Sequence, residues 1–120
     1  MTWSFNGDRP IYTQLVEQLQ LRIVTGYYPP GGRLEPVREL ASDAAVNPNT
    51  MQRAMLELER QGLVYSQRTA GRFVTEDEGA IRALRERLAR DKIQAFFREM
   101  ETLGYGRQDI LTWIEEEEHT

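Results

Sequence analysis

The fold is decided by one stretch, Asn47-Pro-Asn-Thr-Met-Gln-Arg-Ala-Met-Leu-Glu-Leu-Glu-Arg-Gln-Gly62, which predicts a single helix with well-marked ends. Asn47 can cap the first free amide groups, and Pro48 suits the first helical position because it has no N–H to lose. Gly62 supplies the left-handed residue that commonly ends a helix. Apolar residues recur at helical spacing and define one buried stripe: Met51, Ala54, Met55 and Leu58.

The polar side of this helix lies in its first two turns, where Asn49, Gln52 and Arg53 cluster. Amide and guanidinium groups at the start of a short helix can read base edges in a major groove. The competing interpretation is a solvated surface, which is the commoner reason for a polar helix face. The elements next to this helix in the sequence are therefore needed to distinguish a DNA-binding face from a solvated one.

Composition excludes several classes of protein. The chain has 120 residues, 40% of them hydrophobic, which fits one small domain with an appendage or two very small units. It has no apolar run of eighteen residues and no signal-like start, so we expect a cytoplasmic protein without a membrane span. It has no cysteine, and its single histidine, His119, forms no convincing metal site or catalytic triad. We therefore predict a protein that is not an enzyme and has no cofactor.

The net charge of −4 argues against a nucleic-acid partner until its distribution is considered. Residues 1–75 hold eight basic and seven acidic side chains, a net charge of +1. Residues 76–120 hold seven basic and twelve acidic side chains, a net charge of −5. The acidity is concentrated in the C-terminal part, and the N-terminal part remains compatible with DNA.

The segments before and after the central helix predict further helices and strands in a characteristic order. Apolar residues spaced four apart from Ile11 predict a helix to about residue 26, and Tyr-Tyr-Pro-Pro-Gly-Gly must then turn. Residues 33–34 allow only a stub of strand, and residues 36–45 form a second helix. The runs 63–66 and 72–75 read as a β-hairpin after the central helix. This mainly α order with a small β-hairpin wing predicts a winged helix-turn-helix domain.

The C-terminal part predicts a two-helix dimerisation region over residues 76–120, after a winged domain over residues 1–75. Its two helices carry more large apolar side chains than they can bury against each other, so we expect them to pack against a second copy of the chain. A ligand pocket beside Phe97 and Trp113 is the alternative for the same side chains. The glutamates 115–118 are expected to lie beyond the last helix as a frayed tail. The expected dimerisation residues are Leu84, Leu88, Phe96, Phe97, Met100, Ile110, Trp113 and Ile114.

Five motifs now resemble the DNA-binding domain of GntR-type bacterial transcription regulators, in the family's order and spacing. They are Pro10-Ile-Tyr-Thr-Gln-Leu, Pro30-Gly-Gly-Arg-Leu, Val37-Arg-Glu-Leu-Ala, Val46-Asn-Pro-Asn-Thr and Leu56-Glu-Leu-Glu-Arg-Gln-Gly-Leu. The short tail resembles the YtrA-type subfamily. The resemblance implies that Arg38 contacts a guanine, and it implies base or phosphate contacts at four further positions: Asn47, Asn49, Thr50 and Arg53. Gln52 lies on the same front.

The chain departs from the family pattern in the wing, in the helix-turn-helix turn and before Val37, where Glu35-Pro36 replaces the usual Pro-Ser. The wing has Thr69 where a glycine is expected and Arg72 where a threonine is expected, and Ala45 takes the place of a glycine in the helix-turn-helix turn. A non-glycine in that turn carries a conformational cost. Arg68, Thr69 and Arg72 are the wing residues expected to meet DNA, and Arg72 can add a phosphate or minor-groove contact.

The sequence therefore predicts a transcription regulator, most simply a repressor, which binds a palindromic operator in double-stranded DNA as a homodimer. A winged-helix module that binds proteins and not DNA is the alternative, and the acidic total charge favours it. A small-molecule effector that enters the helical dimer interface is a further hypothesis.

Overall fold

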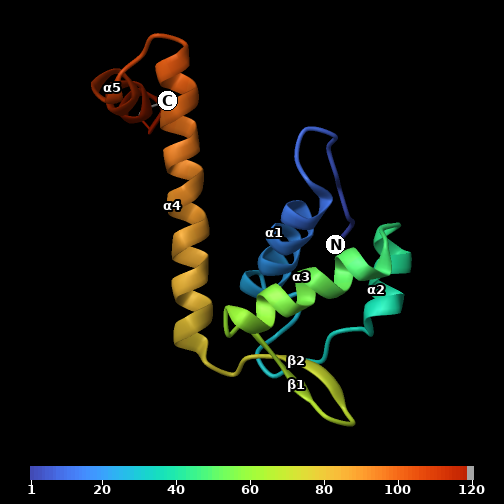
Figure 1. The fold of residues 1–120 in the computed structure, drawn as a ribbon. Coiled ribbons are helices and arrows are strands. Elements are labelled where there is room, and N and C mark those ends of the chain that lie inside the picture. The colour runs from blue at the N-terminus through green and yellow to red at the C-terminus, as the bar shows by residue number, and fades with distance from the viewer. Residues whose placement is uncertain (119–120) are drawn as a thin grey trace. The chain divides into compact units, whose positions relative to one another are not determined.

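The computed structural model describes residues 1–118, and the prediction about His119 lies outside this range. The elements are, in chain order, α1 (Ile11–Val24), α2 (Val37–Ala44), α3 (Pro48–Arg60), β1 (Val64–Gln67), β2 (Gly71–Val74), α4 (Glu78–Thr102) and α5 (Arg107–Glu118) (Figure 1). The chain forms two compact units, one over residues 1–84 and one that begins at Arg85. The predicted winged helix-turn-helix fold, followed by two helices, is confirmed.

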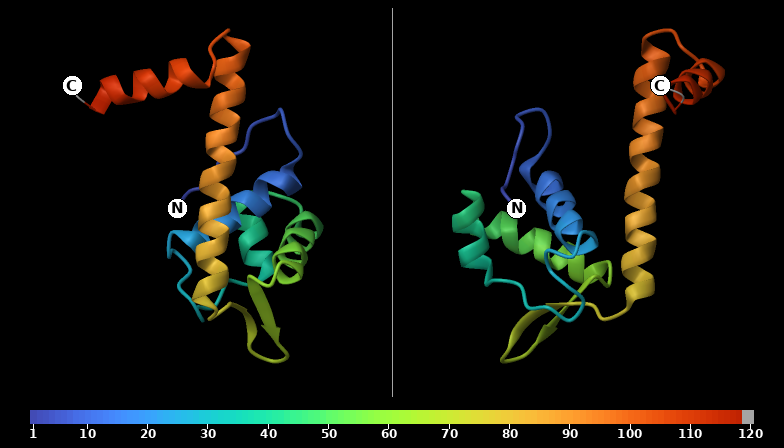
Figure 2. Two further views of the ribbon diagram at one scale, coloured as in Figure 1. Left: turned by 90° about the vertical axis from the view of Figure 1, so that its left-hand side faces the viewer. Right: turned by 180° about the vertical axis from the view of Figure 1, so that it is seen from behind.

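The core of the first unit forms between α1 and α3, which lie against each other in every view (Figures 1 and 2). Leu15 and Leu19 of α1 are fully buried, as are Met51 and Met55 of α3. Each such side chain stabilises the folded state by about 1.5–3 kcal/mol relative to exposure. Because the stripe on α3 is fully buried, the opposite side of α3 is held outward in a fixed orientation.

The wing is a two-stranded hairpin whose outer edge is not free, because an isolated bridge joins Arg33 to Phe73 of β2. β1 and β2 pair antiparallel from Val64↔Val74 to Gln67↔Gly71. The other edge of β2 is covered by the residues that follow the Pro-Gly-Gly turn. The Leu34 amide donates to the Arg72 carbonyl at 2.9 Å, and the Val74 amide donates to the Gly32 carbonyl at 2.9 Å. The predicted strand stub at residues 33–34 is confirmed, and it anchors the wing to the body of the unit.

An N-terminal segment before α1 is bound along that helix. The Gln18 side-chain amide makes two hydrogen bonds with the backbone of Ser4, and the Gln14 amide makes two with the backbone of Asn6. The buried Arg22 guanidinium lies 3.8 Å from the Trp3 ring centroid. It also donates to the Tyr28 hydroxyl at 3.2 Å and to the Met1 carbonyl at 3.1 Å. Arg22 therefore holds the N-terminal segment through the Met1 carbonyl and the Trp3 ring.

The second unit consists of the later turns of α4, a tight reversal and α5. Gly104 takes a φ of 96° in the reversal, and the Gly106 amide donates to the Asp109 carboxylate at 3.1 Å, where α5 begins. The prediction that residues 115–118 form a frayed tail is wrong, because α5 continues through the glutamates to Glu118. Glutamate has a high intrinsic helix propensity, which outweighs its unfavourable interaction with the C-terminal end of the helix dipole.

Within residues 1–118, no helix combines the length and the apolar character that crossing a membrane requires.

Candidate nucleic-acid interface

The N-terminal end of α3 presents the polar residues that the sequence singled out. The Asn47 side-chain oxygen accepts from the Asn49 amide at 2.7 Å, so the predicted cap is formed. Pro48 occupies the first turn. Asn49 and Arg53 are exposed, and Gln52 is half-buried. The Asn47 oxygen accepts this cap bond, and the amide NH₂ group makes no hydrogen bond with another described residue, so its two donors are available to a partner outside the chain.

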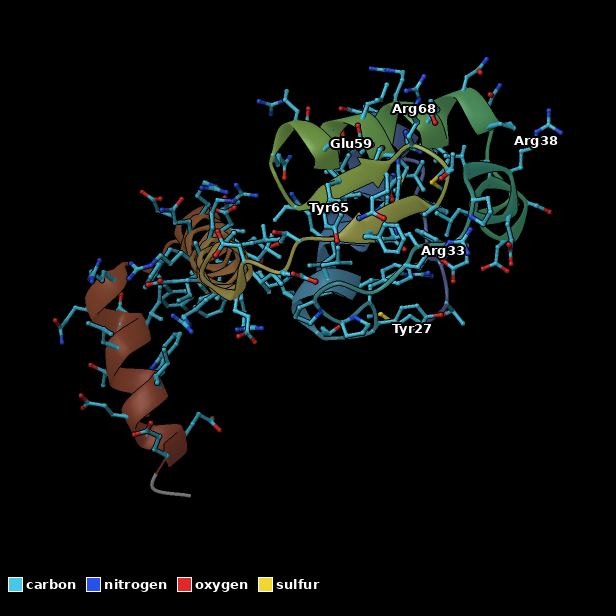
Figure 3. All side chains as sticks on the ribbon, turned by 90° about the horizontal axis from the view of Figure 1, so that it is seen from below. Tyr27, Arg33, Arg38, Glu59, Tyr65 and Arg68 are labelled. Atoms are coloured by element: carbon cyan, nitrogen blue, oxygen red, sulfur yellow. The ribbon has the colours of Figure 1, made fainter. Side chains whose placement is uncertain are left out.

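The turn between α2 and α3 is made by Ala45, which lies in the left-handed region at φ 56° and ψ 46°. The Val46 amide donates to the Ala41 carbonyl at 2.9 Å, so the chain reverses within one turn of α2. Arg38 lies in the first turn of α2 and is exposed; it makes no hydrogen bond or ion pair with another described residue (Figure 3). Its five N–H donors are therefore available to an external partner.

Arg53 has an internal neighbour that sequence reasoning did not pair with it. Its guanidinium carbon lies 4.3 Å from the centroid of the Tyr12 ring, in α1. A cation over an aromatic face is stabilised by about 0.5–1 kcal/mol at exposed sites. The ring leaves the N–H donors at the edge of the guanidinium free while restricting where the side chain can go. Tyr12 therefore belongs to the candidate interface as a support for Arg53.

The turn of the wing consists of Arg68, Thr69 and Ala70. The Ala70 amide donates to the Gln67 carbonyl at 3.1 Å, which closes the turn. Arg68 and Thr69 are exposed, and Arg68 has no hydrogen bond or ion pair to the rest of residues 1–118 (Figure 3). Both side chains are placed where an external partner can reach them.

Arg72 has a different environment from Arg68, although both lie in the wing. Its Nε donates to the Glu59 carboxylate of α3 at 2.7 Å, and its Nη1 donates to the Gln52 amide oxygen at 3.3 Å. Its side chain is 20% exposed. The structure thus brings Arg72 to α3, and the contact with DNA that the sequence suggested for this residue stays a prediction.

The carboxylates near the end of α3 are held in their charged form. The Arg60 guanidinium and the Gln61 amide donate to Glu57 and lower its pKa from 4.5 to about 2. The Ser66 hydroxyl and the Arg72 guanidinium lower the pKa of Glu59 in the same way. Among residues 1–118, no three His, Cys, Asp or Glu side chains are grouped so that they could hold a metal ion.

The predicted dimerisation residues divide into two groups. Leu84 and Ile110 are already buried within the chain, at 4% and 2% exposed. Phe96, Trp113 and Ile114 are exposed by 42–47%. The remaining three are half-buried: Leu88, Phe97 and Met100.

The predicted ligand site beside Phe97 and Trp113 coincides only in part with an open depression in the second unit. Phe97, Tyr105, Arg107 and Ile110 contribute to its lining. Trp113 is not among the lining residues and packs on the Tyr105 ring, with centroids 4.8 Å apart.

Comparison with known proteins places these features in a family context. Residues 11–74 match the family model for bacterial regulatory proteins of the gntR family. YhcF of Bacillus subtilis, an uncharacterised HTH-type transcriptional regulator, is 36% identical over 92% of both chains. The HTH-type transcriptional repressor YtrA of Bacillus subtilis is 33% identical over 92% of this chain and 85% of its own length.

Two solved structures are also similar. A GntR family transcriptional regulator from Listeria monocytogenes superposes with a TM-score of 0.83 at 39% identity, over 93% of this chain and 98% of its own. The DNA-binding domain of AraR, solved in complex with the operator ORX1, superposes with a TM-score of 0.56 at 30% identity, over 60% of this chain and 93% of its own. The first similarity extends over both units, and the second covers a length close to that of the winged domain.

Proposed function

Because the chain belongs to the gntR family of bacterial regulatory proteins, and is thus a DNA-binding transcription regulator and not an enzyme, we propose that it acts as a homodimeric repressor on a palindromic operator. Two winged domains would place their α3 helices in successive major grooves, about 34–36 Å apart. Bivalent attachment then converts two weak contacts into one strong and specific one. Its place of action is the cytoplasm, where bacterial DNA lies.

One observation supports base reading most directly: cationic and amide donors near the helix-turn-helix turn are left without internal partners. Arg38 has no ion pair among the described residues, and Arg53 is steadied by a ring rather than by a carboxylate. An arginine that is not neutralised inside the chain can bind guanine O6 and N7 with two parallel hydrogen bonds. The residues proposed to contact DNA are Arg38, Asn47, Asn49, Thr50, Gln52, Arg53, Arg68 and Thr69.

The proposal of a homodimer is supported by the composition of the second unit. Among residues 85–118, Ile110 is the one buried large apolar side chain. The exposed large apolar side chains of this unit are Ile93, Phe96, Leu103, Tyr105, Leu111, Trp113 and Ile114. A segment of fewer than about 40 residues rarely buries enough surface to be stable alone, and oligomerisation is one common solution. We therefore place the dimer interface on this unit, where a second copy would cover these side chains.

The experiment that tests DNA binding is selection of bound sequences from a pool of random duplexes, followed by a salt titration on the selected sequence. The logarithm of affinity should fall with the logarithm of salt concentration, with a slope of about −0.9 for each phosphate contact. A palindromic selected sequence with this salt dependence is the expected result. If the protein selects no sequence and binds no duplex at low salt, the proposal fails and the alternative of a winged-helix module that binds proteins is favoured.

A further inference from the structure

Arg72 lies on the side of the wing that faces α3. Side chains alternate along a strand, so Arg72 shares its face of β2 with Val74, which is fully buried. Its cross-strand partner is Ser66 of β1. The side chain therefore starts from the inner face of the hairpin, and its direction is set by the same alternation that buries Val74.

The guanidinium of Arg72 joins two residues on one side of the recognition helix. Gln52 and Glu59 are seven residues apart, which is two helical turns, so they share a face of α3. Glu59 accepts from Arg72 Nε at 2.7 Å and from the Ser66 hydroxyl, so it fixes the guanidinium from the wing side of α3. The Nη1 of the same guanidinium then reaches the Gln52 amide oxygen at 3.3 Å.

This contact determines which end of the Gln52 amide faces outward. Arginine has only donors, so it can meet only the oxygen of the amide and never its NH₂ group. The oxygen of Gln52 is thereby directed to the wing. The NH₂ group, on the opposite side of the amide carbon, is left for a partner in the major groove.

We infer that Arg72 is a positioning residue that makes Gln52 a hydrogen-bond donor toward the operator, so that Gln52 favours guanine and not adenine. The inference rests on the proposed DNA-binding function. Glutamine reads adenine by accepting from N6 and donating to N7 at the same time, which requires the amide oxygen to face the base. Guanine presents two acceptors, N7 and O6, both of which suit an amide whose NH₂ group faces the base while its oxygen is turned to Arg72.

The test is selection from a random duplex pool with the full-length wild type and with Arg72→Thr, which removes the guanidinium. Threonine is favoured in strands, so the hairpin is expected to form. In the variant the Gln52 oxygen is released, and the ratio of adenine to guanine at one operator position should rise by about tenfold, the lower part of the range for one bidentate pair. Arg72→Met, with a longer apolar stem, should give the same change.

Arg68→Met is the matched control, since it removes one arginine from the same hairpin. It should weaken binding to all sequences by a similar factor and leave the base preference unchanged. In a Gln52→Ala background, Arg72→Thr should no longer alter the preference at that position, because the residue that transmits the effect is gone. A role of Arg72 in wing stability alone would not depend on Gln52 in this way.

Three outcomes overturn the inference. The base preference of Arg72→Thr and Arg72→Met could match that of the wild type, or the change could persist in the Gln52→Ala background, or it could spread over all positions. Each of these shows that Arg72 does not act through Gln52. If the wild type selects no sequence at all, the proposed function fails and this inference fails with it, a result that differs from all three.

Discussion

Ala45 offers the most direct test of how the helix-turn-helix turn is made. Within residues 1–118 it is the one non-glycine residue with a positive φ, at 56°. In this conformation the Cβ of an L-residue crowds the following carbonyl oxygen, which costs roughly 1–2 kcal/mol. Ala45→Gly removes the Cβ and should relieve this strain without changing the backbone.

The expected gain in stability is smaller than the strain itself. A glycine also gives the unfolded chain more conformations, which costs about 0.4–1 kcal/mol of stability. The difference predicts that Ala45→Gly raises the free energy of unfolding by about 0.5–1 kcal/mol. For a chain of 120 residues this corresponds to a rise in Tm of about 2–5 °C.

The assay is thermal and urea unfolding of the full chain at one fixed protein concentration, because association makes Tm depend on concentration. Ala44→Gly is the matched control, since Ala44 is the last helical residue of α2 and is 7% exposed. Glycine there loses helix propensity and a buried methyl group, so stability should fall by about 1 kcal/mol or more. An Ala45→Gly protein no more stable than the wild type would show that the strain at this turn does not exceed the cost of about 0.4–1 kcal/mol that glycine carries in the unfolded chain, and would refute the expected strain of roughly 1–2 kcal/mol.

Three further predictions concern the proposed interface and its supports. Arg38→Ala should cost roughly 1–3 kcal/mol in operator affinity and relax base preference at one position. Arg87→Ala, which removes an exposed arginine of α4 outside the proposed DNA-contacting residues, should leave the base preference unchanged, and equal loss by Arg38→Ala on specific and random duplexes would contradict base reading. Trp113→Glu should shift the protein from dimer to monomer in analytical ultracentrifugation, and an intact dimer would refute the placement of the interface. Glu59→Gln should destabilise the protein at neutral pH, because the pKa of Glu59 is lowered by folding. That stabilisation is complete above the unfolded value of about 4.5 and is lost as the pH falls through the lower folded pKa, so the two proteins should converge below pH 4.5 in urea unfolding.

Local sequence determined α3 and its ends. Asn47 caps α3, Pro48 occupies its first turn, and Gly62 takes a φ of 77° just beyond its last turn. Each of these signals acts over a few residues, through a hydrogen bond to a nearby amide or through the permitted values of φ. The buried stripe of α3 was predictable for the same reason, because the helical repeat alone decides which side chains share a face.

The C-terminal end of α5 depends on local interactions, but the position predicted for it from the sequence was wrong. Two local effects compete at residues 115–118, the high helix propensity of glutamate and its repulsion by the helix C-terminus. The helix reaches Glu118, so propensity prevails. The free energies of these two opposing effects differ by tenths of a kcal/mol per residue, a difference that the sequence pattern alone does not resolve.

Only the tertiary structure decided which of the predicted DNA-contacting side chains bind other residues of the chain and which remain available to an external partner. From the sequence, Arg68 and Arg72 were both expected to meet DNA as arginines of one wing. In the structure Arg72 binds Glu59 and Gln52, whereas Arg68 binds neither of these residues. Arg53 and Tyr12 are likewise far apart in the chain and meet only because α1 packs on α3. The physical reason is that alternation along a strand fixes the face of the sheet on which a side chain lies. The residue that this side chain contacts depends on which helix or strand the core packs against that face.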